Sequence, residues 1–148
     1  MAGPPLNFYG SDTYHMSAII ANHDYVLYTG DTDFLLSHWD QYVLAMSFIT
    51  AKIDDTSMLY VTGTADWGRL TQGGHNTEAN MLMYRVLTTA STMAQWAGED
   101  DLSSNWTTLA ENLKSATNVA LWDSTVGYVY ENYASMECMA FTDKSQGV

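Results

Sequence analysis

The stretch between positions 65 and 80 holds the densest group of functional side chains in the sequence. An acid, an indole and a guanidinium come first and are followed by two glycines: Asp66, Trp67, Arg69, Gly73 and Gly74. Three polar residues then fall where a helix is expected to begin: His75, Asn76 and Glu78. Glycines let a loop approach a ligand closely, and a helix N-terminus presents N–H groups to it. An ordinary capped helix start after a solvated loop has the same pattern, because Asn and Glu are common there.

Asp66 and Glu78 are the carboxylates that we consider first for acid–base chemistry. Two carboxyl groups that flank a glycosidic bond can act as the acid and the base in its hydrolysis. Trp67 could stack on the face of a sugar, and Arg69 or His75 could bind its hydroxyl groups. A structural role competes with each of these, since Asp66 could pair with Arg69 and Trp67 could belong to the core.

Other kinds of site are poorly supported by the sequence. His75 and Glu78 have a spacing with which one helix face could ligate a metal, but a second such cluster is missing, so we predict neither a metal site nor a cofactor. The single cysteine, Cys138, cannot form an internal disulfide. The sequence also contains no nucleophile elbow and no phosphate-binding glycine loop.

The composition predicts a single domain over residues 1–148. A hydrophobic content of 47% is sufficient for a core and excludes a disordered chain. The formal charge of −12 disfavours nucleic acid and anionic membranes as partners, and it is compatible with a neutral polyhydroxylated ligand such as a carbohydrate. No apolar run approaches the roughly 18 residues of a transmembrane helix, and the first residues do not form a signal peptide.

Four long helices are predicted, at about 12–29, 32–53, 76–97 and 101–121. Ser11 is suited to cap the first helix and Gly30 to end it. The second and fourth helices carry apolar stripes with steps of three and four residues, which indicate core-facing sides. Residues 54–74 form a connection of a length that is usually functional, and residues 122–130 are expected to form a turn or short β-hairpin. The predicted fold class is all-α, built of antiparallel helical hairpins.

The short links within each hairpin make the first and third helices point the same way. Their N-termini, and the loop that leads into the third helix, therefore lie at one end of the bundle. We call the side chains gathered there the predicted rim: Asp12, His15, Asp66, Trp67, Arg69, His75 and Glu78. Asp66 and Glu78 are its candidate catalytic residues. The candidate sugar-binding residues are Asp12, His15, Trp67, Arg69, His75 and Asn76.

Several segments of this chain together match a known family. They are residues 10–16 (Gly-Ser-Asp-Thr-Tyr-His-Met), 25–31, 64–69 (Thr-Ala-Asp-Trp-Gly-Arg) and 72–80 (Gln-Gly-Gly-His-Asn-Thr-Glu-Ala-Asn). With these segments the chain resembles the six-hairpin glycosidases of the α-L-rhamnosidase type, particularly fungal ones. The resemblance covers roughly residues 3–133.

The resemblance implies that the helices belong to a partial (α/α)6 barrel, the middle portion of a catalytic domain. The family's general acid lies in a motif before the matched part and its base comes from a later hairpin, and neither motif occurs in this chain. Asp66, Trp67 and Glu78 then correspond to pocket-side positions. We expect a glycoside hydrolase-like segment that acts on, or derives from an enzyme acting on, terminal α-L-rhamnosyl or similar sugars, and that is inactive alone.

Two other classes of function remain open on the sequence: a non-catalytic carbohydrate-binding module and a helical protein-interaction module. Four helices cannot close a twelve-helix barrel. The first and third helices, which we expect to be the inner ones, should therefore leave apolar faces uncovered and favour self-association. The resemblance implies an extracellular location, which the lack of a signal peptide in this chain does not support.

Overall fold

Five α-helices make up most of the described structure, a computed structural model in which residues 10–62, 65–66, 69–70, 73–125 and 128–129 are described. The helices are α1 (Asp12–Thr29), α2 (Thr32–Ser37), α3 (Trp39–Thr50), α4 (Thr77–Ala97) and α5 (Asp100–Leu121). Two antiparallel pairs of two-residue strands accompany them: β1 (Ala65–Asp66) with β2 (Arg69–Leu70), and β3 (Trp122–Asp123) with β4 (Tyr128–Val129). The predicted all-α class is confirmed, and β3 pairs with β4 where a turn or short β-hairpin is predicted.

Capping residues set the ends of α1, as the sequence predicts, and those of α4. The Ser11 side chain accepts a hydrogen bond from the Tyr14 N–H at the start of α1, and the Asn76 side chain accepts one from the Ala79 N–H at the start of α4. Gly30 ends α1 and Gly98 ends α4, with φ angles of 68° and 80°. Glycine adopts this left-handed conformation without the steric penalty that other residues meet, so both helices stop there.

The second predicted helix, 32–53, is divided in the structure. α2 ends at Ser37 and α3 begins at Trp39, because His38 has a φ of −113° and a ψ of 10° that lie outside the helical range. The His38 ring Nδ1 lies 3.0 Å from the Phe34 carbonyl oxygen, to which the His38 backbone N–H also donates. Side-chain competition for a helical carbonyl of this kind distorts a helix locally. α3 also ends at Thr50, three residues earlier than predicted.

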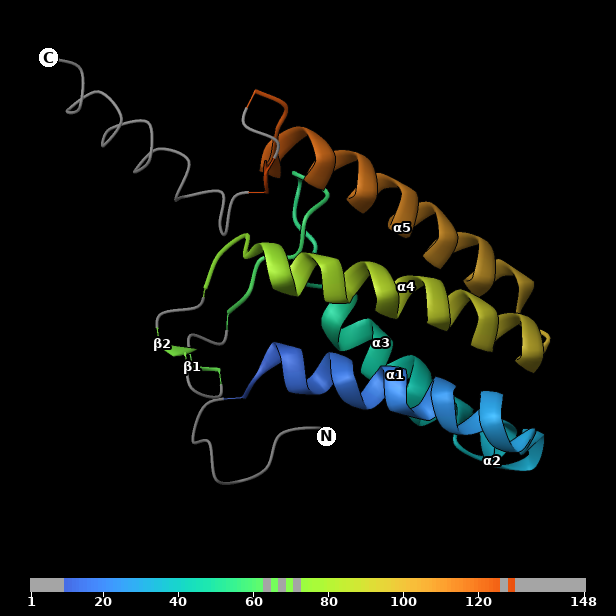
Figure 1. The fold of residues 1–148 in the computed structure, drawn as a ribbon. Coiled ribbons are helices and arrows are strands. Elements are labelled where there is room, and N and C mark those ends of the chain that lie inside the picture. The colour runs from blue at the N-terminus through green and yellow to red at the C-terminus, as the bar shows by residue number, and fades with distance from the viewer. Residues whose placement is uncertain (1–9, 63–64, 67–68, 71–72, 126–127, 130–148) are drawn as a thin grey trace, which may run out of the picture.

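α4 is the central helix of the bundle. Ten of its residues are buried, and it packs against α5 on one side and against α1 on another. Figure 1 shows that α1 and α4 run in the same direction and begin at the same end, next to β1 and β2. The core residues on α4 include Met83, Val86, Leu87 and Met93. The predicted co-orientation of the first and third long helices is therefore confirmed.

An aromatic cluster joins α3 to α5. The rings of Trp39 and Tyr42 stack with centroids 5.6 Å apart, and Trp106 of α5 meets both rings edge-on. Burial raises the pKa of the Tyr42 phenol, and its hydroxyl has no hydrogen-bond partner within the described part of the chain. A buried hydroxyl without a partner carries a desolvation cost that packing must offset.

Within the described ranges, no helix combines the length and the apolar character that a membrane crossing requires.

Candidate functional site

The connection between α3 and α4 is attached to the start of α1 by a buried charge pair. Asp12 lies in the first turn of α1 with only 3% of its side chain exposed, and the Lys52 ammonium binds its Oδ1. Its Oδ2 accepts the Thr62 backbone N–H at 3.0 Å. Lys52 also donates to the Thr62 hydroxyl at 2.8 Å and lies 4.6 Å from the centroid of the Phe48 ring. Asp12 thus holds both ends of the segment 52–62 against α1.

The same connection is attached to α4 by the side chain of Asn80. This amide is fully buried, and its Oδ1 accepts the Leu59 backbone N–H at 2.7 Å. Its Nδ2 donates to the Leu59 carbonyl at 3.1 Å and to the Asn76 carbonyl at 2.8 Å. Two backbone hydrogen bonds between Val61 and Gly74, of 2.9 and 3.0 Å, extend this attachment to the residues before α4. The connection therefore has a defined position above the helix ends.

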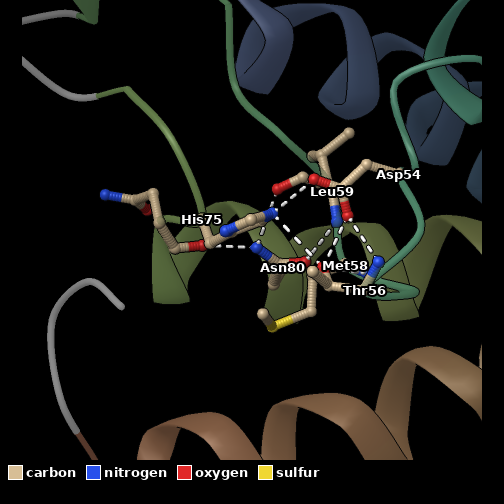
Figure 2. Close-up of polar contacts among 7 residues, drawn as sticks. Asp54, Thr56, Met58, Leu59, His75 and Asn80 are labelled. Atoms are coloured by element: carbon tan, nitrogen blue, oxygen red, sulfur yellow. Dashed lines mark hydrogen bonds and ion pairs between the residues drawn. The ribbon is translucent and has the colours of Figure 1, made fainter. Parts of the chain in front are cut away.

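A carboxylate, a hydroxyl and an imidazole meet where this connection faces the start of α4, and we call Asp54, Thr56 and His75 the Asp54 cluster. His75 Nε2 lies 2.7 Å from Asp54 Oδ2, and the Thr56 hydroxyl and N–H donate to Asp54 Oδ1 at 2.5 and 3.0 Å. Figure 2 shows these contacts beside the amide of Asn80. The Tyr60 ring meets the His75 ring edge-on at 5.3 Å.

The contacts of the Asp54 cluster keep its carboxylate ionised. Partial burial by itself would raise the pKa of Asp54, but the hydrogen bonds from Thr56 and His75, together with the charge of His75, hold this pKa below its usual value. The cluster is only partly shielded from solvent, since 32% of the Asp54 side chain and 14% of the His75 side chain are exposed. Such a carboxylate–imidazole pair can bind a hydroxyl group or transfer a proton.

His15, which the sequence places in the predicted rim, is directed toward α3. Its Nε2 lies 2.8 Å from the Ala45 carbonyl oxygen and so carries the hydrogen. Its ring is tilted against Phe48 with centroids 4.9 Å apart. This contact joins α1 to α3, and a role for His15 in sugar binding stays a prediction.

The loop residues of the predicted rim are described only in part. β1 and β2 pair with Asp66 opposite Arg69 at this end of the bundle. The side chains of these two residues, and the whole of Trp67, lie outside the described part of the chain. Their predicted roles as acid and sugar-binding residues therefore stay predictions.

The remaining rim residues lie at the start of α4. Asn76 is buried and caps the helix through its side-chain oxygen, which gives it a structural role beside the predicted binding role. Glu78 is exposed in the first turn of α4, where a negative charge is favourable. Its predicted catalytic role is not tested by this geometry. Asp12, His75 and Glu78 nevertheless lie at one end of the bundle, as the sequence predicts (Figure 1).

Sequence reasoning missed the residues that hold this end together: Lys52, Asp54, Thr56 and Asn80. A local signal exists for one pair, because an Asp followed two residues later by Thr commonly forms a side-chain-to-backbone turn. The other two residues have partners that are 40 and 21 positions away in the sequence: Asp12 for Lys52 and Leu59 for Asn80. No spacing rule in a single sequence identifies pairs of that separation.

A groove of about 530 Å³ lies between the 56–58 turn and the C-terminal half of α5. Its walls are formed by uncharged side chains: Thr56, Ser57, Met58, Asn112, Ser115, Ala116, Val119 and Ala120. Uncharged walls cannot supply acid–base chemistry. Among the described residues, no group of three or more His, Cys, Asp or Glu side chains is arranged to hold a metal ion. The titratable groups of interest are therefore those at the starts of α1 and α4.

Comparison with known protein families identifies the fold. A family described as the bacterial alpha-L-rhamnosidase six-hairpin glycosidase domain matches residues 6–142. The chain belongs to this six-hairpin glycosidase family. No curated protein is similar enough to be matched with it. The helical hairpins of this glycosidase domain, α1 with α2 and α3 and then α4 with α5, are consistent with the family's hairpin architecture.

Proposed function

We propose that this chain forms part of the wall of a sugar-binding pocket in a glycosidase acting on terminal α-L-rhamnosyl or similar sugars. One observation carries the proposal: in a chain of the six-hairpin glycosidase family, the starts of α1 and α4 and the paired strands β1 and β2 lie at one end of the bundle (Figure 1). Three separate segments that carry polar residues thus meet at one place, as a sugar site requires. The formal charge of −12 favours a neutral sugar over an anionic one.

In this proposal the loop supplies the direct contacts. Trp67 stacks on the sugar ring, and Arg69, His75 and Asn76 bind hydroxyl groups. Asp66 and Glu78 are the carboxylates nearest in sequence to these groups, and they are the candidates for acid–base work. Asp12 acts indirectly by positioning the connection between α3 and α4, because both of its carboxylate oxygens have partners in that connection.

Calorimetric titration of the chain with methyl α-L-rhamnoside tests this proposal, with the uronic acid D-glucuronate as the anionic comparison. We expect saturable binding of the neutral rhamnoside and weaker binding of the uronate. Trp67→Ala should lower the affinity, whereas Trp122→Ala, which removes an exposed indole on β3, serves as the matched control. The proposal fails if the folded chain binds no sugar, or if both tryptophan variants lose affinity equally.

Hydrolysis is a separate measurement. With an aryl α-L-rhamnoside we expect no turnover by the chain alone, because the general acid and base implied by the family resemblance do not occur in it. Turnover that is abolished by Asp66→Asn or Glu78→Gln would overturn the expected inactivity and assign catalysis to these residues. Sugar binding without turnover would agree with a role as part of a sugar-binding pocket. A tight oligomer that binds no sugar would favour the helical protein-interaction module instead.

A further inference from the structure

The hydrogen-bonding pattern of the Asp54 cluster determines which nitrogen of His75 carries a hydrogen. Asp54 presents two oxygens that are used differently: Oδ1 accepts the Thr56 hydroxyl and backbone N–H, and Oδ2 lies 2.7 Å from His75 Nε2. An ionised carboxylate can only accept hydrogen bonds. The contact at Oδ2 is therefore a donation from Nε2.

The Thr56 hydroxyl supports the same assignment. Its hydrogen is directed to Asp54 Oδ1 at 2.5 Å, so its oxygen lone pairs are left to face His75 Nε2 at 3.3 Å. Two acceptors, one carboxylate oxygen and one hydroxyl oxygen, thus lie around a single ring nitrogen. The alternative, a bare Nε2, would place its lone pair against the carboxylate at hydrogen-bond distance, which is repulsive.

We propose that Asp54 is a positioning residue that holds His75 as the Nε2–H tautomer and fixes the plane of its ring at the start of α4. In the neutral imidazole the other nitrogen, Nδ1, is then an acceptor, so its partners are donors such as an N–H or a sugar hydroxyl. The sugar-binding part of this inference rests on the proposed function; the tautomer does not. Carboxylates that orient a histidine from behind, without touching the ligand, are a common device in protein sites.

The position of Asp54 is itself determined by neighbouring groups. The Asp54 backbone N–H donates to the Met58 carbonyl at 3.1 Å, and the Asn80 amide holds Leu59 on α4 at 2.7 Å (Figure 2). The carboxylate therefore reaches His75 from a backbone that is anchored on α4, the helix that begins two residues after His75. The hydrogen bonds that Asp54 makes with His75 and Thr56 restrict the rotation of the Asp54 and His75 side chains.

Nitrogen-15 NMR of the imidazole rings tests the tautomer directly. The chain has four histidines, and His75→Gln identifies the signals of His75 by their disappearance. At a pH where His75 is neutral, we expect its long-range proton–nitrogen correlations to show a hydrogen on Nε2 and none on Nδ1. In Asp54→Asn the side-chain amide can donate or accept, so a mixture of the two tautomers should appear. Asp55→Asn, which changes the exposed neighbouring carboxylate, should leave the pattern as in the unaltered chain.

Sugar affinity supplies the second measurement. If the unaltered chain binds methyl α-L-rhamnoside, Asp54→Asn should weaken this binding about ten-fold, the lower end of the effect typical for removal of an orienting partner. Thr56→Val should cause a smaller loss, Thr56→Ser should preserve affinity, and Asp55→Asn should have no effect.

The two measurements separate the two proposals. A chain that binds no sugar but shows the Nε2–H tautomer, lost in Asp54→Asn, contradicts the proposed function and supports the positioning role. A hydrogen on Nδ1 in the unaltered chain, or a pattern that Asp54→Asn leaves unchanged, overturns the positioning role whatever the sugar affinity.

Discussion

Replacing Asn80 with leucine should destabilise the chain more than any conservative change on the exposed face of α4. Asn80 and Leu59 are both 0% exposed, and the Asn80 amide satisfies the Leu59 N–H and the Leu59 carbonyl at 2.7 and 3.1 Å. Among the described residues these two backbone groups have no other partner. Leucine is similar in size to asparagine but offers no hydrogen bond, so both groups would be buried without partners.

The size of the effect follows from these two groups. An unpaired buried donor or acceptor costs about 1–3 kcal/mol, so Asn80→Leu should lower the free energy of unfolding by about 3 kcal/mol. Urea denaturation followed by circular dichroism measures this difference, provided that the denaturant dependence of the two proteins is the same. Gln95→Leu, on the exposed side of the same helix, is the matched control and should stay within about 0.5 kcal/mol.

A second substitution at the same position separates hydrogen bonding from packing. Asn80→Asp keeps an acceptor for the Leu59 N–H but cannot donate to the Leu59 and Asn76 carbonyls while it is ionised. Its stability deficit should therefore shrink as the pH is lowered and the carboxyl becomes protonated. If Asn80→Leu costs less than about 1 kcal/mol, the amide does not hold the connection on α4, and the reasoning from these hydrogen bonds is refuted.

Three further outcomes follow from the structure. Tyr42→Phe removes the buried hydroxyl that has no partner within the described ranges, so it should raise the free energy of unfolding by about 1 kcal/mol; a loss of stability in urea denaturation would show that the hydroxyl has a partner. The pKa of Asp54 is lower in the folded chain, so its carboxylate stabilises the fold above an unfolded-state pKa of about 4 and this contribution is lost as the pH falls. The unaltered chain should accordingly melt at a higher temperature than Asp54→Asn at neutral pH, with a gap that narrows below about pH 4; a constant gap would contradict the lowered pKa. Leu44 and Phe48 on α3 are 72% and 53% exposed, so sedimentation should show self-association of the chain. Leu44→Glu or Phe48→Glu should weaken this association, and salt should strengthen it by screening the charge of −12. A monomer at all concentrations would exclude self-association through this face.

Helix boundaries were predictable because they depend on neighbours in the sequence. Ser11, Asn76, Gly30 and Gly98 act within their own turns, through a side-chain oxygen or a left-handed φ. The apolar stripe of α4 has a helical period, and the residues that form it are buried as expected. The common orientation of α1 and α4 followed from short links, which leave a helical hairpin only one way to pack.

The division of the second predicted helix at His38 was not predictable from its hydrophobic pattern. Leu35, Tyr42 and Met46 are all buried, so the stripe passes through the interruption without a change. The deviation arises from a side-chain contact to the Phe34 carbonyl and from the stacking of the Phe34 and His38 rings. Both are local, but their outcome depends on the ring conformations that the fold selects.

The sequence by itself determined the all-α class, the ends of α1 and α4, and the gathering of Asp12, His75 and Glu78 at one end of the bundle, since these follow from periodicity, capping and link length. Only the tertiary structure decided which side chains act there. It paired Lys52 with Asp12, Asp54 with His75, and Asn80 with Leu59, across 40, 21 and 21 positions. Such pairs form because a buried charge or amide must find a partner, and which partner is within reach depends on the folded path of the connection.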